Sequence, residues 1–390
     1  MPRRTRPRRA GAIVPIAVAG ALFPALIGLL GAGPASASSP AAAGSYIVVL
    51  KTGADARPVA NTMARHGVTP KQVLSSALNG YVTTMTTDQV AAVRADSRVA
   101  YVEPDGIVRA TGQTLPLGVN RIDADLSRTR AGNGWGAVGL VNAYVIDSGI
   151  SPHADLNIVG HKNWTGDGKY YDCNGHGTHV AGIIGAKDNA SYVVGAAPGV
   201  ALTDLKVLGC NRTGLTSNVI AAVDWVAANA KKPAVVNLSL SGPPSDALDT
   251  AVRNAAAKGV LMVIAAGNDG ANACNYSPAR AGAGTDNGII TVGATDASNA
   301  AASFSNYGPC VDIWAPGVAV LSTWNNGGMA TMSGTSMAAP LVVGAGLLYE
   351  AMYKTTYMPS AERIIKSRYL ATGKKSRDGR PIKIVYARSY

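Results

Sequence analysis

The sequence predicts an α/β protein, a doubly wound parallel sheet with helices on both faces, preceded by a smaller α+β domain. The chain has 390 residues, of which 47% are hydrophobic, so it can bury more than one core. Beyond residue 111, apolar runs alternate with helical stretches. These runs are continuously apolar, which is typical of strands buried on both faces of a parallel sheet.

The smaller domain is expected at residues 38–110. Three short β-like runs, at 46–50, 81–85 and 99–102, are separated by helix-like stretches. They contain no cysteine and no group of side chains suited to catalysis. Residues 106–117 lose the periodic pattern and are predicted to be an exposed linker.

In the larger domain, residues 111–390, the predicted strands lie at 141–146, 205–208, 235–240 and 260–266, and the predicted helices at 216–230 and 245–257. In open sheets of this kind, functional sites lie at the carboxyl ends of the strands. Polar residues that directly follow a predicted strand are therefore the first candidates for a site.

Residues 1–37 are predicted to be a secretory signal peptide. Five arginines precede an apolar stretch at 10–32, and the small residues at 35–37 provide a cleavage site. A transmembrane anchor is the alternative, but two prolines and several glycines interrupt the stretch. We expect a secreted, extracellular protein that holds no membrane segment after cleavage.

The formal net charge of +12 suggests nucleic acids or membrane surfaces as binding partners. Its distribution argues against both. Five of the positive charges lie in the first nine residues, and ten basic residues follow position 350, so the middle of the chain is close to neutral. We expect no nucleic-acid partner.

The four cysteines all lie in the larger domain, at Cys173, Cys210, Cys274 and Cys310. Secretion into an oxidising compartment and the even count predict two disulfides. The sequence itself allows three pairings. A zinc site is disfavoured because no two cysteines lie within four residues of each other.

Three polar residues form a candidate catalytic group. Asp147 directly follows the first strand of the larger domain, and His176 begins a small-residue helix in the run NGHGTHVAG. Ser336 follows a glycine turn in SGTSMAAP and opens an apolar helix. A serine hydroxyl becomes nucleophilic when an imidazole takes its proton, and a carboxylate orients that imidazole.

The order Asp, His, Ser along the chain differs from the chymotrypsin and α/β-hydrolase orders. In these motifs the chain resembles the subtilisin-like serine proteases, and is most similar to the proteinase K and aqualysin branch. The resemblance extends over nearly the whole exported chain and implies a subtilisin-like fold for residues 111–390. It also implies an inhibitor-type propeptide at 38–110.

The resemblance implies a role for each motif residue. Asp147 corresponds to the orienting acid, His176 to the general base and Ser336 to the nucleophile. Asn268, at the end of a predicted strand, corresponds to the side-chain donor of the oxyanion hole. His179 is expected to be structural, because the acid and third ligand of a zinc-protease helix are missing.

The resemblance also implies that two exposed strands hold an extended peptide through main-chain hydrogen bonds. The residues concerned are Ser239, Leu240, Ser241 and Gly242 on one strand, Gly214 on the other, and Ala266 and Gly267 in the pocket wall. The pocket has small residues and no acid at its base, so we expect apolar or aromatic side chains to be preferred. The family usually has glycine at the position of Ser241 and a small residue at that of Arg212, and both changes are expected to narrow the cleft.

Two further expectations follow from the resemblance. The disulfides should join Cys173 to Cys210 and Cys274 to Cys310. The N-terminal domain should act as an intramolecular chaperone and inhibitor, removed by self-cleavage near residues 109–111. The protein is expected to be a monomer that acts on protein and peptide substrates.

The chain departs from the family pattern at two places. Ala339 and Leu341 stand where the family has a hydroxyl residue and a histidine, so altered activity or stability is expected. Asp312 corresponds to an aspartate that binds calcium in proteinase K, but the adjoining loop at 280–288 is changed. Asp312 could bind a structural calcium ion or cap a turn, and both alternatives remain open. No cofactor is expected for catalysis.

The leading hypothesis is a secreted serine endopeptidase of broad specificity, matured by autocatalytic removal of its propeptide. Two alternatives remain. Ser241, Ala339 and Leu341 would also suit a catalytically silent protease fold that serves as a binding module. An esterase, or a peptidase restricted to its own precursor, would keep the chemistry and change the substrate.

Overall fold

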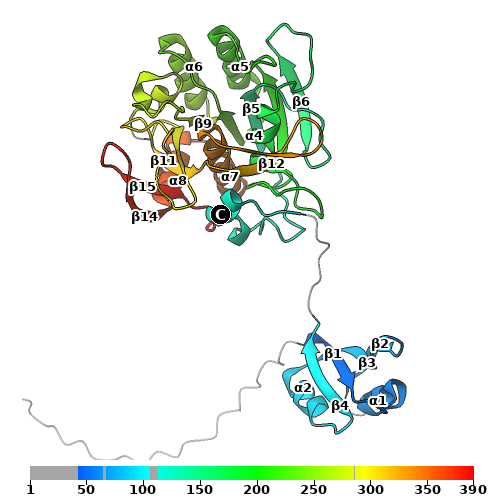
Figure 1. Cartoon of the computed structure of the whole chain (residues 1–390). Coiled ribbons are helices and arrows are strands. Elements are labelled where there is room, and N and C mark those ends of the chain that lie inside the picture. The colour runs from blue at the N-terminus through cyan, green and yellow to red at the C-terminus, as the bar shows by residue number, and fades with distance from the viewer. Residues whose placement is uncertain (1–42, 65–66, 106–112, 285) are drawn as a thin grey trace, which may run out of the picture. The chain divides into compact units, whose positions relative to one another are not determined.

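The computed structural model describes residues 43–64, 67–105, 113–284 and 286–390, which fall into two compact units (Figure 1). The predicted signal peptide at 1–37 and the expected cleavage point near 109–111 lie outside these residues. Each unit has its own sheet and its own core.

The N-terminal unit is an antiparallel sheet with two helices. Its elements are β1 (Gly44–Leu50), α1 (Ala56–Met63), β2 (Pro70–Leu74), β3 (Gly80–Met85), α2 (Thr87–Arg94) and β4 (Val99–Pro104), and the strand order is β2-β3-β1-β4. The three predicted strands correspond to β1, β3 and β4. The sequence PKQVL of β2 is mostly polar and gave no strand signal. The core of the unit contains Val48, Tyr81 and Val93.

The larger unit is built on a nine-stranded sheet, in the order β14-β15-β11-β10-β9-β8-β5-β7-β6. All neighbouring strands are parallel except β14 and β15. The strands are β5 (Asn142–Asp147), β6 (Ile158–Asn163), β7 (Ala201–Lys206), β8 (Ala234–Leu238), β9 (Leu261–Ala265), β10 (Ile289–Thr295), β11 (Ile313–Pro316), β14 (Tyr369–Lys375) and β15 (Pro381–Val385). The predicted doubly wound parallel sheet is confirmed.

Helices cover both faces of this sheet (Figure 1). The helices are α3 (Leu117–Arg121), α4 (His176–Gly185), α5 (Thr216–Asn229), α6 (Asp246–Ala257), α7 (Thr335–Tyr353) and α8 (Met358–Ser367), with short 3₁₀ helices at Ala124–Leu126, Ala273–Asn275 and Ala279–Gly282. One core joins α4, α7 and α8 to the sheet, and the other joins α5 and α6 to its opposite face. Within β5, Val145 belongs to the first core and Ile146 to the second, which explains why the strands are continuously apolar.

The central helix α7 is long and apolar enough to cross a membrane, but 89% of its most apolar window is buried inside the protein. It packs on the sheet and on α4 as a core helix, and a small antiparallel pair, β12 (Val320–Thr323) and β13 (Met329–Met332), lies close to α4. This packing places the start of α7, with Ser336, beside the carboxyl ends of the strands.

The described end of the predicted linker is attached to the larger unit. The Gln113 side-chain amide donates to the carbonyls of Lys187 and Val193, at 2.8 and 3.2 Å, and Thr114 forms a parallel bridge with Val193. From residue 113 onward the predicted exposed linker is therefore an attached segment, although Thr114 and Leu117 are exposed as expected.

Candidate active site

Asp147 and His176 form a buried hydrogen-bonded pair. Asp147 is the last residue of β5, and His176 is the first residue of α4, after the left-handed Gly175. His176 Nδ1 lies 2.7 Å from Asp147 Oδ1, and the two side chains are 2% and 0% exposed. The carboxylate at Nδ1 fixes the proton on that nitrogen, so Nε2 is free to act as a base.

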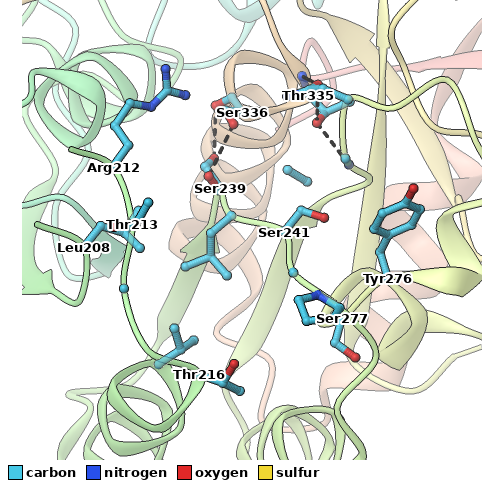
Figure 2. Close-up of a pocket in the computed structure, with 18 of the residues that line it drawn as sticks. Leu208, Arg212, Thr213, Thr216, Ser239, Ser241, Tyr276, Ser277, Thr335 and Ser336 are labelled. Atoms are coloured by element: carbon cyan, nitrogen blue, oxygen red, sulfur yellow. Dashed lines mark hydrogen bonds between the residues drawn. The ribbon is translucent and has the colours of Figure 1, made fainter.

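Ser336 lies in the first turn of α7 and lines the same cavity as His176. Its hydroxyl donates to the carbonyl of Ser239 at 3.2 Å, and the Ser239 hydroxyl donates to the Ser336 carbonyl at 3.0 Å (Figure 2). Within the described part of the chain, His176 Nε2 has no hydrogen-bond partner although it is buried. The acid and base are therefore joined, and the hydroxyl is turned toward Ser239.

Asp172, which the sequence analysis did not single out, organises the start of α4. Its carboxylate accepts hydrogen bonds from the Ser148 hydroxyl and from the backbone N–H groups of Asn174, Gly175 and Thr178, all between 2.8 and 2.9 Å. Ser148 in turn accepts the N–H of Gly177. Asp172 thus connects the residue after Asp147 to both neighbours of His176.

Asn268 lies beside Ser336 on the cavity and is held by Thr335 and by the turn that precedes it. Gly267 there has a φ of +101°, and a Cβ on it would lie 2.4 Å from Asn306 Nδ2. Only glycine fits this position, because the Asn306 side chain bonds to Ala266 O, Asp269 N and Ala271 N around the turn.

The cavity that contains His176 and Ser336 has a volume of about 620 Å³ (Figure 2). Most of the predicted substrate-binding residues line it: Gly214, Ser239, Leu240, Ser241, Gly242 and Gly267. Thr213, which belongs to the second expected strand, also lines it, and three further lining residues were not expected from the sequence, namely Thr216, Tyr276 and the exposed acid Asp269. Arg212, noted in the sequence only as a bulky replacement, also lines it.

Ala266 is placed differently from its prediction. It is fully buried in the core between the sheet and α5 and α6, whereas Ala265 lines the cavity. Side chains alternate between the two faces of an extended chain, and here Ala265 faces the cavity while Ala266 faces the core. The pocket wall is formed by Ala265 and Gly267.

The two segments expected to hold the peptide are not strands in the free protein. Residues 211–215 are exposed, and residues 239–242 carry only a bridge between Gly242 and Ser277. Within the described chain, the backbone N–H groups of Gly214 and Ser241 donate to no other backbone group. The Ser241 hydroxyl lies close to Gly267.

The two family departures in α7 are buried. Ala339 and Leu341 are 0% exposed, and the end of the Leu341 side chain lies against Gly118 of α3. Apolar packing takes the place of a polar side chain here.

His179 has a structural environment. Its Nε2 faces the carbonyls of Val320 and Ala330 at 3.1 and 3.0 Å, and its own carbonyl accepts the Ser322 hydroxyl. Burial lowers the pKa of His179 to about 4, so the ring is neutral at physiological pH. It fastens α4 to the β12–β13 pair.

Both disulfides have the pairing implied by the resemblance, Cys173–Cys210 and Cys274–Cys310. The first connects the segment just before His176 to the turn that carries Arg212. It therefore braces one wall of the cavity.

Asp312 does not fit a calcium ion as the side chains are arranged. One of its oxygens lies 3.3 Å from the Lys366 ammonium and the other accepts the Thr291 N–H at 2.8 Å. Lys366 also pairs with Glu362, whose second oxygen accepts the N–H groups of residues 287 and 288. The partly buried Lys366 ammonium already lies beside this carboxylate, and a second cation there would be repelled.

Comparisons with known proteins show which proteins this chain resembles. Residues 144–381 match the model of the subtilase family, peptidase S8, and residues 45–111 match that of peptidase inhibitor I9. An extracellular serine proteinase of Thermus sp. strain Rt41A is 42% identical over 80% of this chain and 81% of its own length. Alkaline serine exoprotease A of Vibrio alginolyticus is 41% identical to this chain. The match covers 79% of this chain and 58% of that relative.

A solved structure shows the same likeness in three dimensions. The crystal structure of a cold adapted subtilisin-like serine proteinase matches with a TM-score of 0.57 and 38% identity. The match covers 68% of this chain and 97% of that one.

Proposed function

The chain belongs to the subtilase family of serine proteinases, and from this premise we propose that it is a secreted endopeptidase with Asp147, His176 and Ser336 as its catalytic residues. The observation that carries the proposal is the Asp147–His176 hydrogen bond, placed so that His176 and Ser336 share one cavity. The hydrogen-bonded Asp147–His176 pair, with Ser336 on the same cavity, argues against a catalytically silent binding module.

The reaction begins when the Ser336 hydroxyl turns from Ser239 O to His176 Nε2. His176 takes the hydroxyl proton while Oγ attacks the peptide carbonyl, and Asp147 stabilises the imidazolium that forms. The imidazolium then gives its proton to the leaving amine, which leaves an acyl group on Ser336. A water molecule activated by His176 hydrolyses this ester and restores the enzyme. Every step uses side-chain and backbone groups of the chain.

The developing oxyanion is stabilised by Asn268 Nδ2 and by the backbone N–H of Ser336. Both lie at the cavity, and the second is at the positive end of α7. One such donor is worth about 3–4 kcal/mol of activation free energy, a magnitude established for subtilisin itself.

The substrate is proposed to be an extended peptide whose residues before the scissile bond lie between residues 213–215 and 239–242. The free N–H groups of Gly214 and Ser241 support main-chain pairing on both sides. The pocket between Ser239-Leu240 and Ala265–Gly267 favours apolar or aromatic side chains. A peptide library in which lysine or arginine dominated at the residue before the scissile bond would contradict this preference.

The proposed precursor has a signal peptide at residues 1–37, an inhibitor propeptide at 38–110 and the peptidase domain at 111–390. The match of residues 45–111 to peptidase inhibitor I9 supports the middle part. We expect the enzyme to remove this segment itself and to act as an extracellular monomer.

The proposed function is tested by expressing residues 38–390 beside a Ser336→Ala variant. The parent should trim itself near residue 110, hydrolyse casein as well as small esters and react with a fluorophosphonate probe, whereas the variant should do none of these. If both proteins stay full length and unreactive under oxidising conditions, the proposal is wrong.

A further inference from the structure

Arg212 places an unpaired positive charge on the wall of the substrate cavity. Apart from His176, the charged residues that line the cavity are Arg212 and Asp269. Arg212 is exposed, and its guanidinium makes no hydrogen bond or ion pair within the described chain. Its charge is therefore available to a bound substrate.

The backbone holds Arg212 at the tip of a closed turn. Arg212 N donates to Gly209 O at 3.0 Å, Gly209 N donates to Thr213 O at 2.9 Å, and Asn211 Oδ1 accepts both donors of Thr213. Arg212 has a φ of +64°, in the left-handed region that disfavours residues with a Cβ. Non-glycine residues in such conformations cluster at functional sites.

The disulfide Cys173–Cys210 fastens this turn to the chain just before His176. Figure 2 shows Arg212 across the cavity from Ser241 and Tyr276, with its side chain extended toward the end where Ser336 lies. In this view the guanidinium lies toward the Ser336 end of the cavity, and Thr216 lies at the other end.

The alternating directions of side chains along an extended peptide indicate which substrate residue faces Arg212. If the residue before the scissile bond fills the pocket beside Ala265 and Gly267, the preceding residue points to the opposite wall. Arg212 lies across the cavity from Ser241, the residue that is close to Gly267. Its planar guanidinium suits a carboxylate better than any other side chain.

We propose that Arg212 selects substrates with aspartate or glutamate at the second residue before the scissile bond. This inference rests on the proposed function and deepens it. It adds a preference for an acidic residue at the second position before the scissile bond to the apolar preference directly before that bond.

The test compares mature enzymes made from the full chain: the parent, Arg212→Gln, Arg212→Lys and Arg253→Gln. Arg253 is an exposed arginine on α6 that lies outside the cavity lining, so its variant controls for total charge. The substrates are three internally quenched peptides with phenylalanine before the scissile bond, which differ only in Glu, Gln or Lys at the preceding residue.

The parent and Arg253→Gln should favour the Glu peptide over the Gln peptide by about fivefold in kcat/KM at low salt. Arg212→Gln should bring this ratio to about 1, and Arg212→Lys should keep part of the ratio. The preference should shrink at about 0.5 M salt, where exposed charges are screened.

The inference is overturned if the parent cleaves the Gln peptide as fast as the Glu peptide, or if Arg212→Gln keeps the parent's ratio. Failure of the proposed function looks different. In that case the parent cleaves none of the three peptides, and the proposed charge preference is wrong together with the proposed activity.

Discussion

Asn268 accepts two hydrogen bonds from Thr335 at Oδ1, one from the backbone N–H at 2.8 Å and one from the hydroxyl at 2.9 Å. Thr335 Oγ1 also accepts the Gly267 N–H at 3.1 Å, so the threonine is itself held in place. Because the amide oxygen is engaged, Nδ2 is the end of Asn268 that is left for the cavity beside Ser336. Thr335 thus determines which end of Asn268 meets the substrate.

Replacing Asn268 with leucine should therefore lower kcat and leave KM almost unchanged. The oxyanion exists only in the transition state, and the corresponding donor in subtilisin contributes about 10²–10³-fold to kcat. The measurement is steady-state hydrolysis of a peptide anilide. Asn254→Leu, on the exposed surface of α6, is the control and should behave as the parent. A rise in KM with kcat unchanged would make Asn268 a substrate-binding residue instead.

Asp172→Asn should reduce both stability and kcat. All the groups that contact the Asp172 carboxylate donate hydrogen bonds to it. The NH₂ group of an asparagine would face at least one of these donors, and buried groups would be left unpaired. We expect a loss of about 2–3 kcal/mol in the free energy of unfolding, measured by urea in a Ser336→Ala background to prevent autolysis. With Ser336 intact, kcat should fall as well. Asp224→Asn on the exposed side of α5 is the control, and equal behaviour of the two variants would contradict the role of Asp172.

Much of the fold and the candidate catalytic residues could be predicted from sequence, because strand ends and helix starts leave local signals. Asp147 follows an apolar run, and Ser336 opens an apolar helix after glycine, as the structure has them. Asp172 could not be found in this way. Its partners are mainly backbone N–H groups, whose directions depend on the turn and not on residue types.

The error at Ala266 has a different cause. Both neighbours in Ala265-Ala266 are small and apolar, and both faces of the sheet are buried, so hydrophobicity does not reveal which residue points into the pocket. The pairing of Lys366 with Asp312 was also beyond sequence reasoning, because the two residues are 54 positions apart and meet only when α8 packs on the sheet.

Lys366→Met should destabilise the protein strongly. Lys366 bridges Asp312 and Glu362, which are 9% and 0% exposed at their side chains, and its removal leaves two buried carboxylates without a cation. Loss of one partner of a buried ion pair costs about 3–5 kcal/mol. Urea unfolding in the Ser336→Ala background measures the change, and Arg363→Gln, exposed on the same helix, is the control. A loss below about 1 kcal/mol would show that water already solvates these carboxylates.

Glu350→Gln should stabilise the protein at alkaline pH. Glu350 is fully buried in α7, and burial raises its pKa to about 7 from an ordinary value of 4.5. Below pH 4.5 the carboxyl is protonated in both the folded and the unfolded state, so its ionisation does not affect the free energy of unfolding. As the pH rises from 4.5 through 7, the unfolded state gains an ionised, solvated carboxylate that the folded state resists, so the free energy of unfolding falls.

Glutamine keeps the shape of the side chain and does not titrate, so the difference between Glu350→Gln and the parent isolates this effect. We expect the stability gain of the variant to be about 2–3 kcal/mol larger at pH 8.5 than at pH 5. Urea unfolding in the Ser336→Ala background at the two values measures it, with Asp224→Asn as the control that should show no such trend. A gain that did not depend on pH would mean that Glu350 is ionised in the folded protein throughout this range, with a partner that compensates its burial.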